Sequence, residues 1–142
     1  FWVSPVLRRV PSAVLPSASL PRRHEVVTRQ IQFDLPSNVY RGVFFWPSLL
    51  KKYSTRLGEV VFFYGFTSTS RNRSLAERFL ISGPAPSDSV PTILDIKLIR
   101  GNRLAVADVS SVSVYKEEEE ILIAANSGFR IDGVWTSTNT LE

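Results

Sequence analysis

Cysteine and methionine are absent from the 142 residues of this chain, and His24 is its one histidine. The lack of cysteine excludes disulfide bonds, thiolate nucleophiles and cysteine-based zinc sites. A single histidine gives little support for a serine–histidine–aspartate triad. Chemistry on this chain must therefore be carried by carboxylates, hydroxyls and arginines, and we expect no bound metal.

Long hydrophobic runs are also missing. The longest, such as residues 60–64, have the length of a strand, whereas a membrane-spanning helix needs ~18 apolar residues. We therefore expect a soluble protein without a membrane span, cytoplasmic or secreted, whose compartment and oligomeric state the composition leaves open. The 17 Lys and Arg residues outnumber the 13 Asp and Glu residues, and a net charge of +4 favours anionic ligands at long range.

The prolines are unevenly distributed along the chain. Five of the nine lie within the first 36 residues, at Pro5, Pro11, Pro16, Pro21 and Pro36. This spacing prevents a long helix. We expect residues 1–24 to be an irregular Pro/Arg-rich lead-in or linker, and residues 25–142 to form one compact domain. A hydrophobic content of 44% is enough for its core.

Alternating and β-rich patterns predict strands over 38–45, 60–64, 92–99, 120–124 and 129–135. One or more helical turns are expected over 48–53, and a short amphipathic helix over 74–80, with Asn72 as its N-cap. Leu75, Ala76, Phe79 and Leu80 share one face of that helix. About five or six strands with one or two helices, and no internal repeat, indicate a twisted, mixed or antiparallel sandwich.

Four of the acidic residues form a single run over 117–120. If residues 118–123 form a strand, Glu118 and Glu120 share one face while Glu119 points to the other. The Cα atoms of the pair would then lie roughly 6–7 Å apart, which suits joint action in one cleft. A solvated acidic patch is the alternative, and it is the better interpretation of a charge run without other context.

Arg41 lies in an apolar strand next to Gly42. Its guanidinium cannot be titrated away, so it needs an anionic partner, and a dinucleotide pyrophosphate would bind it with two hydrogen bonds. Gly42 would allow a ligand to approach the backbone and bind it through a carboxamide. An internal salt bridge, or an edge arginine facing water, remains the alternative for Arg41 alone.

Hydroxyl side chains follow the expected strand over 60–64, in the segment 66–70. They suit hydrogen bonds to a sugar, the orientation of a carboxylate, or the capping of the next helix. For Thr69 and Ser70 we prefer capping.

In this order the three segments resemble the mono-ADP-ribosyltransferase family, specifically the arginine-serine-glutamate branch of cholera-toxin type, which includes NAD(P)+-arginine ADP-ribosyltransferases. The matching pieces are 40–42, 66–70 and 118–120 followed by 121–123, and the resemblance covers residues 26–135. It implies an α+β fold of two packed, mostly antiparallel β-sheets around an NAD cleft, with few short helices and a reduced or missing N-terminal helical lobe. Residues 25–142 would be the catalytic domain, in a fragment of a larger enzyme.

The resemblance implies that NAD is the co-substrate. It places Arg41 on the NAD pyrophosphate, Gly42 on the nicotinamide carboxamide, and the hydroxyls of Ser68, Thr69 and Ser70 in the cofactor-binding segment. Ser68 would orient the catalytic glutamate and the nicotinamide ribose.

The same resemblance makes Glu120 the residue that stabilises the oxocarbenium-like transition state as nicotinamide leaves. Glu118 would orient an acceptor guanidinium and assist its deprotonation, which indicates a protein arginine as the acceptor. The loop 108–117 would face the target protein, with Tyr115 as a candidate contact; a packing role for this aromatic ring is equally compatible with the sequence.

Three other functions compete with arginine transfer. An NAD glycohydrolase would use water in place of the acceptor, and a non-catalytic NAD- or protein-binding module would keep the fold alone. A basic nucleic-acid binder ranks last, because the aromatic residues lie in apolar strand runs and are not interleaved with Lys and Arg.

Overall fold

A computed structural model describes residues 2–9, 36–99 and 106–137. These residues form eight strands, two α-helices and a short 3₁₀ helix, η1. In chain order the elements are β1 (Trp2–Arg9), β2 (Asn38–Phe45), α1 (Pro47–Thr55), β3 (Val60–Phe63), β4 (Thr67–Ser70), α2 (Arg73–Ser82), β5 (Val90–Lys97), β6 (Val106–Asp108), η1 (Lys116–Glu118), β7 (Glu120–Ile123) and β8 (Ser127–Ser137).

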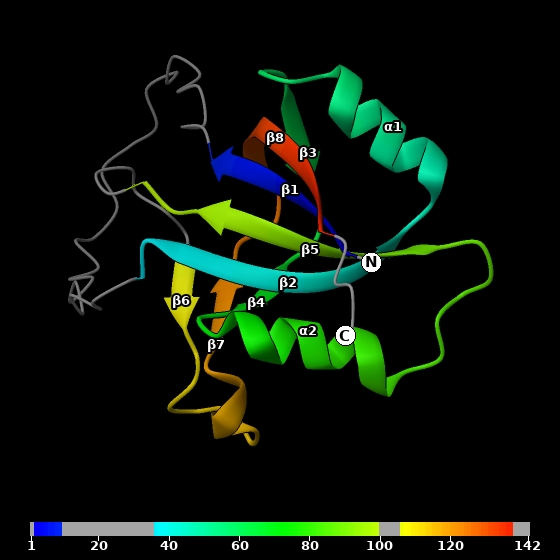
Figure 1. Ribbon diagram of the computed structural model, residues 1–142. Coiled ribbons are helices and arrows are strands. Elements are labelled where there is room, and N and C mark those ends of the chain that lie inside the picture. Colours follow the sequence, from blue (N-terminus) through cyan, green and yellow to red (C-terminus); the bar gives the residue numbers. More distant parts are fainter. Residues whose placement is uncertain (1, 10–35, 100–105, 138–142) are drawn as a thin grey trace, which may run out of the picture.

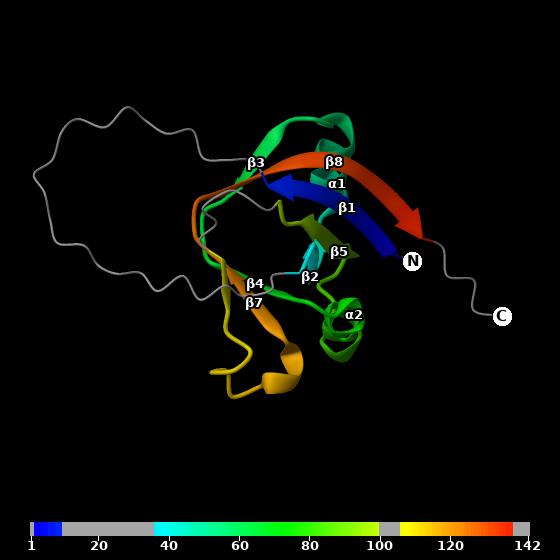
Figure 2. The ribbon, with the colours of Figure 1, turned by 90° about the vertical axis from the view of Figure 1, so that its left-hand side faces the viewer.

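The strands are hydrogen-bonded in the order β3-β8-β1-β5-β2-β4-β7-β6. All neighbouring pairs are antiparallel except β1 and β5. The link between β2 and β4 consists of one residue pair, Tyr40 with Ser70. The order therefore divides into a larger part, β3-β8-β1-β5-β2, and a smaller part, β4-β7-β6, which Figures 1 and 2 show on different sides of the molecule. The predicted α+β fold of mostly antiparallel strands in two parts is confirmed.

The main core lies between the larger part of the sheet and the strands of the smaller part. Its buried side chains come from β1, β2, β5, β7 and β8, from the residue just after β5 and from α1: Leu7, Val39, Tyr53, Leu94, Ile96, Leu98, Ile121, Ile123, Phe129 and Ile131. Each part buries apolar side chains against the other. This burial holds the two parts of the sheet together, although only one residue pair joins them by backbone hydrogen bonds.

Helix α2 covers the opposite face of the larger part and runs along β2 (Figure 1). Asn72 is its N-cap, and the Asn72 side chain accepts a hydrogen bond from the Ser74 amide at 3.0 Å. Ala76 and Leu80 of this helix pack against Ile93 of β5. The predicted helix and its cap are therefore confirmed.

The prediction of an irregular lead-in over residues 1–24 is wrong for Trp2–Arg9. These residues form β1, which lies between β8 and β5 in the middle of the larger part of the sheet. The proline content led to this wrong prediction, because proline is tolerated in a strand at positions where the hydrogen-bonded ladder to a neighbouring strand is interrupted. Strand β1 pairs with β5 at Val3 and again from Val6 onward, so the interruption falls at Ser4 and Pro5. Residues 10–24 lie outside the described residues.

Several other predicted elements have different bounds or numbers in the structure. The helix expected over 48–53 extends over Pro47–Thr55, with Pro47 in its first turn, where a missing amide proton does no harm. The strand expected over 92–99 is Val90–Lys97. The five or six strands expected become eight, because β1 and β6 were not predicted as strands and β4 was interpreted as a hydroxyl-bearing loop. In the part of the chain that the structure describes, neither helix has the length and apolarity needed to cross a membrane.

Candidate active site

The pocket of interest opens where β2 and β4 separate. The two strands pair at Tyr40 and Ser70 and then diverge, so the side chains beyond this point face a cleft bordered by α2. Its cavity volume is about 250 Å³, a little below the usual range of about 300–1,000 Å³ for small-molecule sites. The residues that line it are Tyr40, Arg41, Gly42, Ser68, Thr69, Ser70, Leu75, Ala76, Phe79, Glu118 and Glu120. Seven of the eight predicted site residues are therefore brought together, and Tyr115 is not among them.

The hydroxyl side chains of strand β4 alternate between the core and the more exposed face of the strand. Thr67 and Thr69 are buried, and the Thr69 hydroxyl donates a hydrogen bond of 2.6 Å to the carbonyl of Ile121. Ser70 lies opposite Glu120 in the β4–β7 ladder, and its hydroxyl accepts a hydrogen bond from the Asn72 amide at 3.0 Å. Ser68, two positions away on the same face as Ser70, is exposed and diagonal to Glu120.

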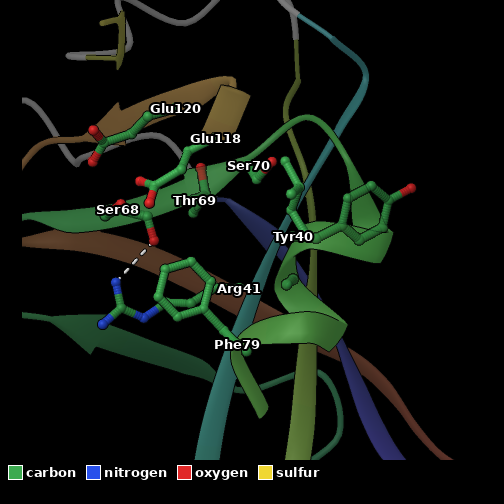
Figure 3. Close-up of a pocket in the computed structure, with 11 residues that line it drawn as sticks. Tyr40, Arg41, Ser68, Thr69, Ser70, Phe79, Glu118 and Glu120 are labelled. Atoms are coloured by element: carbon green, nitrogen blue, oxygen red, sulfur yellow. Dashed lines mark hydrogen bonds between the residues drawn. The ribbon is translucent and has the colours of Figure 1, made fainter. Parts of the chain in front are cut away.

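Arg41 extends from β2 across the opening of the cleft. Its Nη1 donates a hydrogen bond of 2.8 Å to the carbonyl oxygen of Ser68, drawn as the dashed line in Figure 3. This bond uses one of the five guanidinium donors. Among the residues that the structure describes, Arg41 has no carboxylate partner. The side chain is half-buried, so its remaining donors are available to an anionic ligand.

Glu118 and Glu120 both line the pocket, although not for the reason that the sequence suggested. The predicted strand 118–123 starts only at Glu120, and Glu118 is the last residue of η1. Glu119 between them has a left-handed backbone, with φ 47° and ψ 47°. The prediction of strand alternation across 118–120 is therefore wrong. Figure 3 shows the two carboxylates on the side of the pocket opposite Arg41 and Phe79.

Comparison with known proteins gives one curated relative, from Vibrio splendidus (strain 12B01), named "Putative NAD(+)–arginine ADP-ribosyltransferase Vis". It is 32% identical over 101 residues, which are 70% of this chain and 38% of the relative. A solved structure, the ADP-ribosyltransferase Vis in complex with the M6 inhibitor, superposes with a TM-score of 0.59 at 30% identity, over 72% of this chain and 44% of that chain. No family model matches the sequence.

This chain is similar to the ADP-ribosyltransferase Vis in sequence, and it has the fold of an ADP-ribosyltransferase. The relationship rests on sequence identity and fold together, since both comparisons cover the same large share of the chain. The chain spans about two fifths of the length of its curated relative.

In the structure of this chain, Gly42 has a clear packing role. A Cβ atom at this position would lie 2.3 Å from the carbonyl oxygen of Ala76 and 3.0 Å from the side chain of Leu80. The glycine therefore lets α2 approach β2 closely. The sequence suggested that Gly42 makes room for a ligand, and the structure adds the helix as a neighbour that requires the same small residue.

Four residues that the sequence analysis did not name as site residues also line the pocket, namely Tyr40, Leu75, Ala76 and Phe79. Phe79 was expected on the core face of its helix, but 62% of its surface is exposed. Helical spacing places Phe79 one turn beyond Leu75, so both side chains face the cleft beside the buried Ala76 and Leu80. Burial and the nearby Asp95 carboxylate raise the pKa of the Tyr40 phenol, which stays neutral at ordinary pH.

An ion pair fixes the outer strand of the smaller part of the sheet. The Arg71 guanidinium contacts the Asp108 carboxylate, which also accepts hydrogen bonds from the Ser110 hydroxyl at 2.5 Å and the Ser110 amide at 3.0 Å. The Ser110 hydroxyl, followed by its amide and the Arg71 guanidinium, lowers the pKa of Asp108. The end of β6 is thereby tied to the segment that follows β4.

Tyr115 lies in the loop between β6 and η1, outside the pocket. Its side chain is 59% exposed, and Val112 and Val114 of the same loop are exposed as well. The structure thus gives Tyr115 no packing partner in the core clusters of the described residues. In residues 2–9, 36–99 and 106–137, no group of three or more His, Cys, Asp or Glu side chains is placed to hold a metal ion.

Proposed function

We propose that this chain transfers ADP-ribose from NAD+ to a protein arginine and releases nicotinamide. The observation that carries the proposal is the single pocket between β2 and β4, which gathers Arg41, Ser68, Glu118 and Glu120. Support comes from the curated relative, which is named "Putative NAD(+)–arginine ADP-ribosyltransferase Vis".

The proposed NAD site uses both strands that border the cleft. Arg41 binds the pyrophosphate through the donors that Ser68 leaves unused, and the Gly42 backbone contacts the nicotinamide carboxamide. The Ser68 hydroxyl faces the ribose. Thr69 and Ser70 shape this wall. The Ser70 hydroxyl accepts a hydrogen bond from the amide of Asn72, the N-cap residue of α2, whereas the Thr69 hydroxyl donates to the Ile121 carbonyl of β7, so the capping role preferred for Thr69 is wrong. The exposed ring of Phe79 offers a flat apolar face to a heterocycle in the pocket.

In the proposed reaction the bond between the ribose anomeric carbon and the nicotinamide nitrogen breaks first. The electron pair leaves with nicotinamide, which becomes neutral, and positive charge develops on the ribose. The Glu120 carboxylate stabilises this charge and accepts a hydrogen bond from a ribose hydroxyl. Ser68, diagonal to Glu120 on the neighbouring strand, holds that carboxylate in place.

Glu118 acts on the acceptor in the second half of the reaction. A guanidinium is protonated at neutral pH and is then a poor nucleophile. The Glu118 carboxylate orients it and takes the proton that is released as the guanidine nitrogen bonds to the anomeric carbon. Tyr115, exposed on the loop that leads to Glu118, contacts the protein that carries the acceptor arginine.

The test of this function compares the native chain with Glu120→Gln, using labelled NAD+ and an arginine-rich acceptor protein. We expect label transfer to fall at least about a hundredfold, because an electrostatic group at the reacting centre is worth that order. Equal labelling by the two proteins would end the assignment. Release of free ADP-ribose at the same rate with and without acceptor would instead identify a glycohydrolase.

The substitution Glu118→Gln tests whether Glu118 and Glu120 have different roles in the reaction. We expect this variant to lose transfer to arginine by about a hundredfold or more while it keeps part of the NAD+ hydrolysis, because water needs no orientation by Glu118. The measurement is the release of nicotinamide and the labelling of acceptor in the same samples. Loss of both activities in parallel would contradict separate roles for the two carboxylates.

A further inference from the structure

The segment that joins Glu118 to Glu120 has an unusual backbone. Glu119 adopts the left-handed conformation, with φ 47° and ψ 47°, directly after η1 and directly before β7. This conformation is unfavourable for residues other than glycine and asparagine, and most unfavourable for β-branched ones. The left-handed residue changes the direction of the chain between the 3₁₀ turn and the strand, and both neighbouring carboxylates line one pocket.

Glu120 is fixed by the sheet on both of its sides. It pairs with Ser70 of β4, and its carbonyl oxygen accepts a hydrogen bond of 3.1 Å from the amide of Val109, just beyond β6. The carbonyl oxygen of Glu119 accepts another, of 3.3 Å, from the amide of Arg71, just beyond β4. The carboxylate at position 120 therefore has a defined place that does not depend on the turn before it.

Glu118 is held only by local hydrogen bonds within the turn. Its amide donates to the carbonyl of Tyr115 at 3.1 Å, and the amide of Glu119 donates to the carbonyl of Lys116 at 3.2 Å. No strand pairing includes Glu118 in the described residues. Its position relative to Glu120 is thus set by the φ and ψ angles of residue 119.

We propose that Glu119 is a positioning residue, whose left-handed backbone places Glu118 beside Glu120 and thereby sets the balance between transfer to arginine and hydrolysis of NAD+. The inference rests on the proposed function, because it assigns the acceptor step to Glu118. The Glu119 side chain is exposed and has no part in this role, since the backbone alone determines the turn.

The experiment compares two uncharged substitutions in the full chain. Asparagine tolerates the left-handed conformation and valine opposes it, so Glu119→Asn and Glu119→Val share the loss of charge but differ in backbone preference. We expect Glu119→Val to lower the ratio of arginine transfer to NAD+ hydrolysis at least about tenfold, because small displacements of a reacting group cost that much or more. We expect Glu119→Asn to keep this ratio within about twofold of the native chain.

A matched control comes from the turn between β7 and β8. Asn126 also has a positive φ, 59°, and is outside the pocket. Asn126→Val introduces the same type of backbone conflict, so it should lower the unfolding temperature without changing the ratio of transfer to hydrolysis. If Glu119→Val does not fold, Glu119→Thr, which is also β-branched but keeps a polar side chain, is measured in its place and should lower the ratio by about threefold.

Two outcomes would overturn the inference. One is a ratio of transfer to hydrolysis that the β-branched variants Glu119→Val and Glu119→Thr leave unchanged, and the other is an equal fall in Glu119→Asn. Failure of the proposed function is recognised separately, since the native chain would then not label an acceptor, whether or not it releases nicotinamide from NAD+.

Discussion

At the scale of single residues, two glycines near the pocket differ in what their surroundings require. Gly42 is in van der Waals contact with α2, and any Cβ atom there would collide with the backbone of Ala76. Gly65, between β3 and β4, has no atom within 4 Å of the place where a Cβ would lie. A backbone collision cannot be relieved by rotating a side chain, so α2 itself would have to move.

This difference predicts the effect of one methyl group. Gly42→Ala should lower the free energy of unfolding by about 1–3 kcal/mol, the usual cost of overpacking a close contact. Gly65→Ala is the matched control and should change it by less than about 0.5 kcal/mol. Denaturant unfolding of the three proteins measures both values. Similar stabilities for the two variants would show that α2 does not pack on β2 as described.

The site residues illustrate what residue-level analysis of the sequence can achieve. Arg41, Ser68, Glu118 and Glu120 were selected by residue type and order along the chain, and the structure places all four around one pocket. The geometric reason given for the two glutamates was wrong, because alternation assumes extended backbone at every position. The left-handed conformation of Glu119 breaks that assumption, and a glutamate at this position gives no local signal for it.

At the scale of elements, helix α2 was predicted with its cap because helical periodicity and capping are local properties. The contact between β6 and the end of β4 was not, because Arg71 and Asp108 are 37 positions apart. Phe79 was missed as a pocket residue for a related reason. Periodicity identifies the apolar face of a helix, but only the placement of β4 decides which part of that face stays uncovered.

The ion pair between Arg71 and Asp108 leads to a pH-dependent prediction. The folded pKa of Asp108 is lowered, so its stabilising effect is present above the unfolded carboxyl pKa of about 3.9 and is lost as the pH falls through the lower folded value. Asp108→Asn should therefore cost about 1 kcal/mol at pH 7. The difference between the two proteins should vanish once the pH is below the folded pKa.

Denaturant unfolding of both proteins at a series of pH values, in the same salt, measures this difference. Asp88, exposed in the turn before β5, provides the control, and Asp88→Asn should leave the pH profile of stability unchanged. A stability difference for Asp108→Asn that is the same at pH 3 and pH 7 would show that the charge of Asp108 does not contribute.

At the scale of the whole molecule, the position of β1 was the largest departure from expectation. A segment with prolines near the start of the chain was interpreted as a linker, yet Trp2–Arg9 forms the strand that joins β8 to β5. Long-range strand pairing is not encoded in local patterns, and the two partners of β1 begin about 90 and 125 positions later in the sequence. The overall class of fold was accessible because many short strands with few helices admit few architectures.

The dependence of the fold on β1 can be tested through Leu7, which is fully buried in the main core. Leu7→Ala should lower the free energy of unfolding by about 2–5 kcal/mol, because it leaves a cavity among side chains of β5 and β8. A domain of this size has about 5–15 kcal/mol in total, so the unfolding transition should shift strongly. Val114→Ala is the control: Val114 is 89% exposed and should change stability by less than about 0.5 kcal/mol. If Leu7→Ala has the same free energy of unfolding as the native chain, β1 does not belong to the sheet. In that case β2, β4 and α2 alone would determine the shape of the cleft.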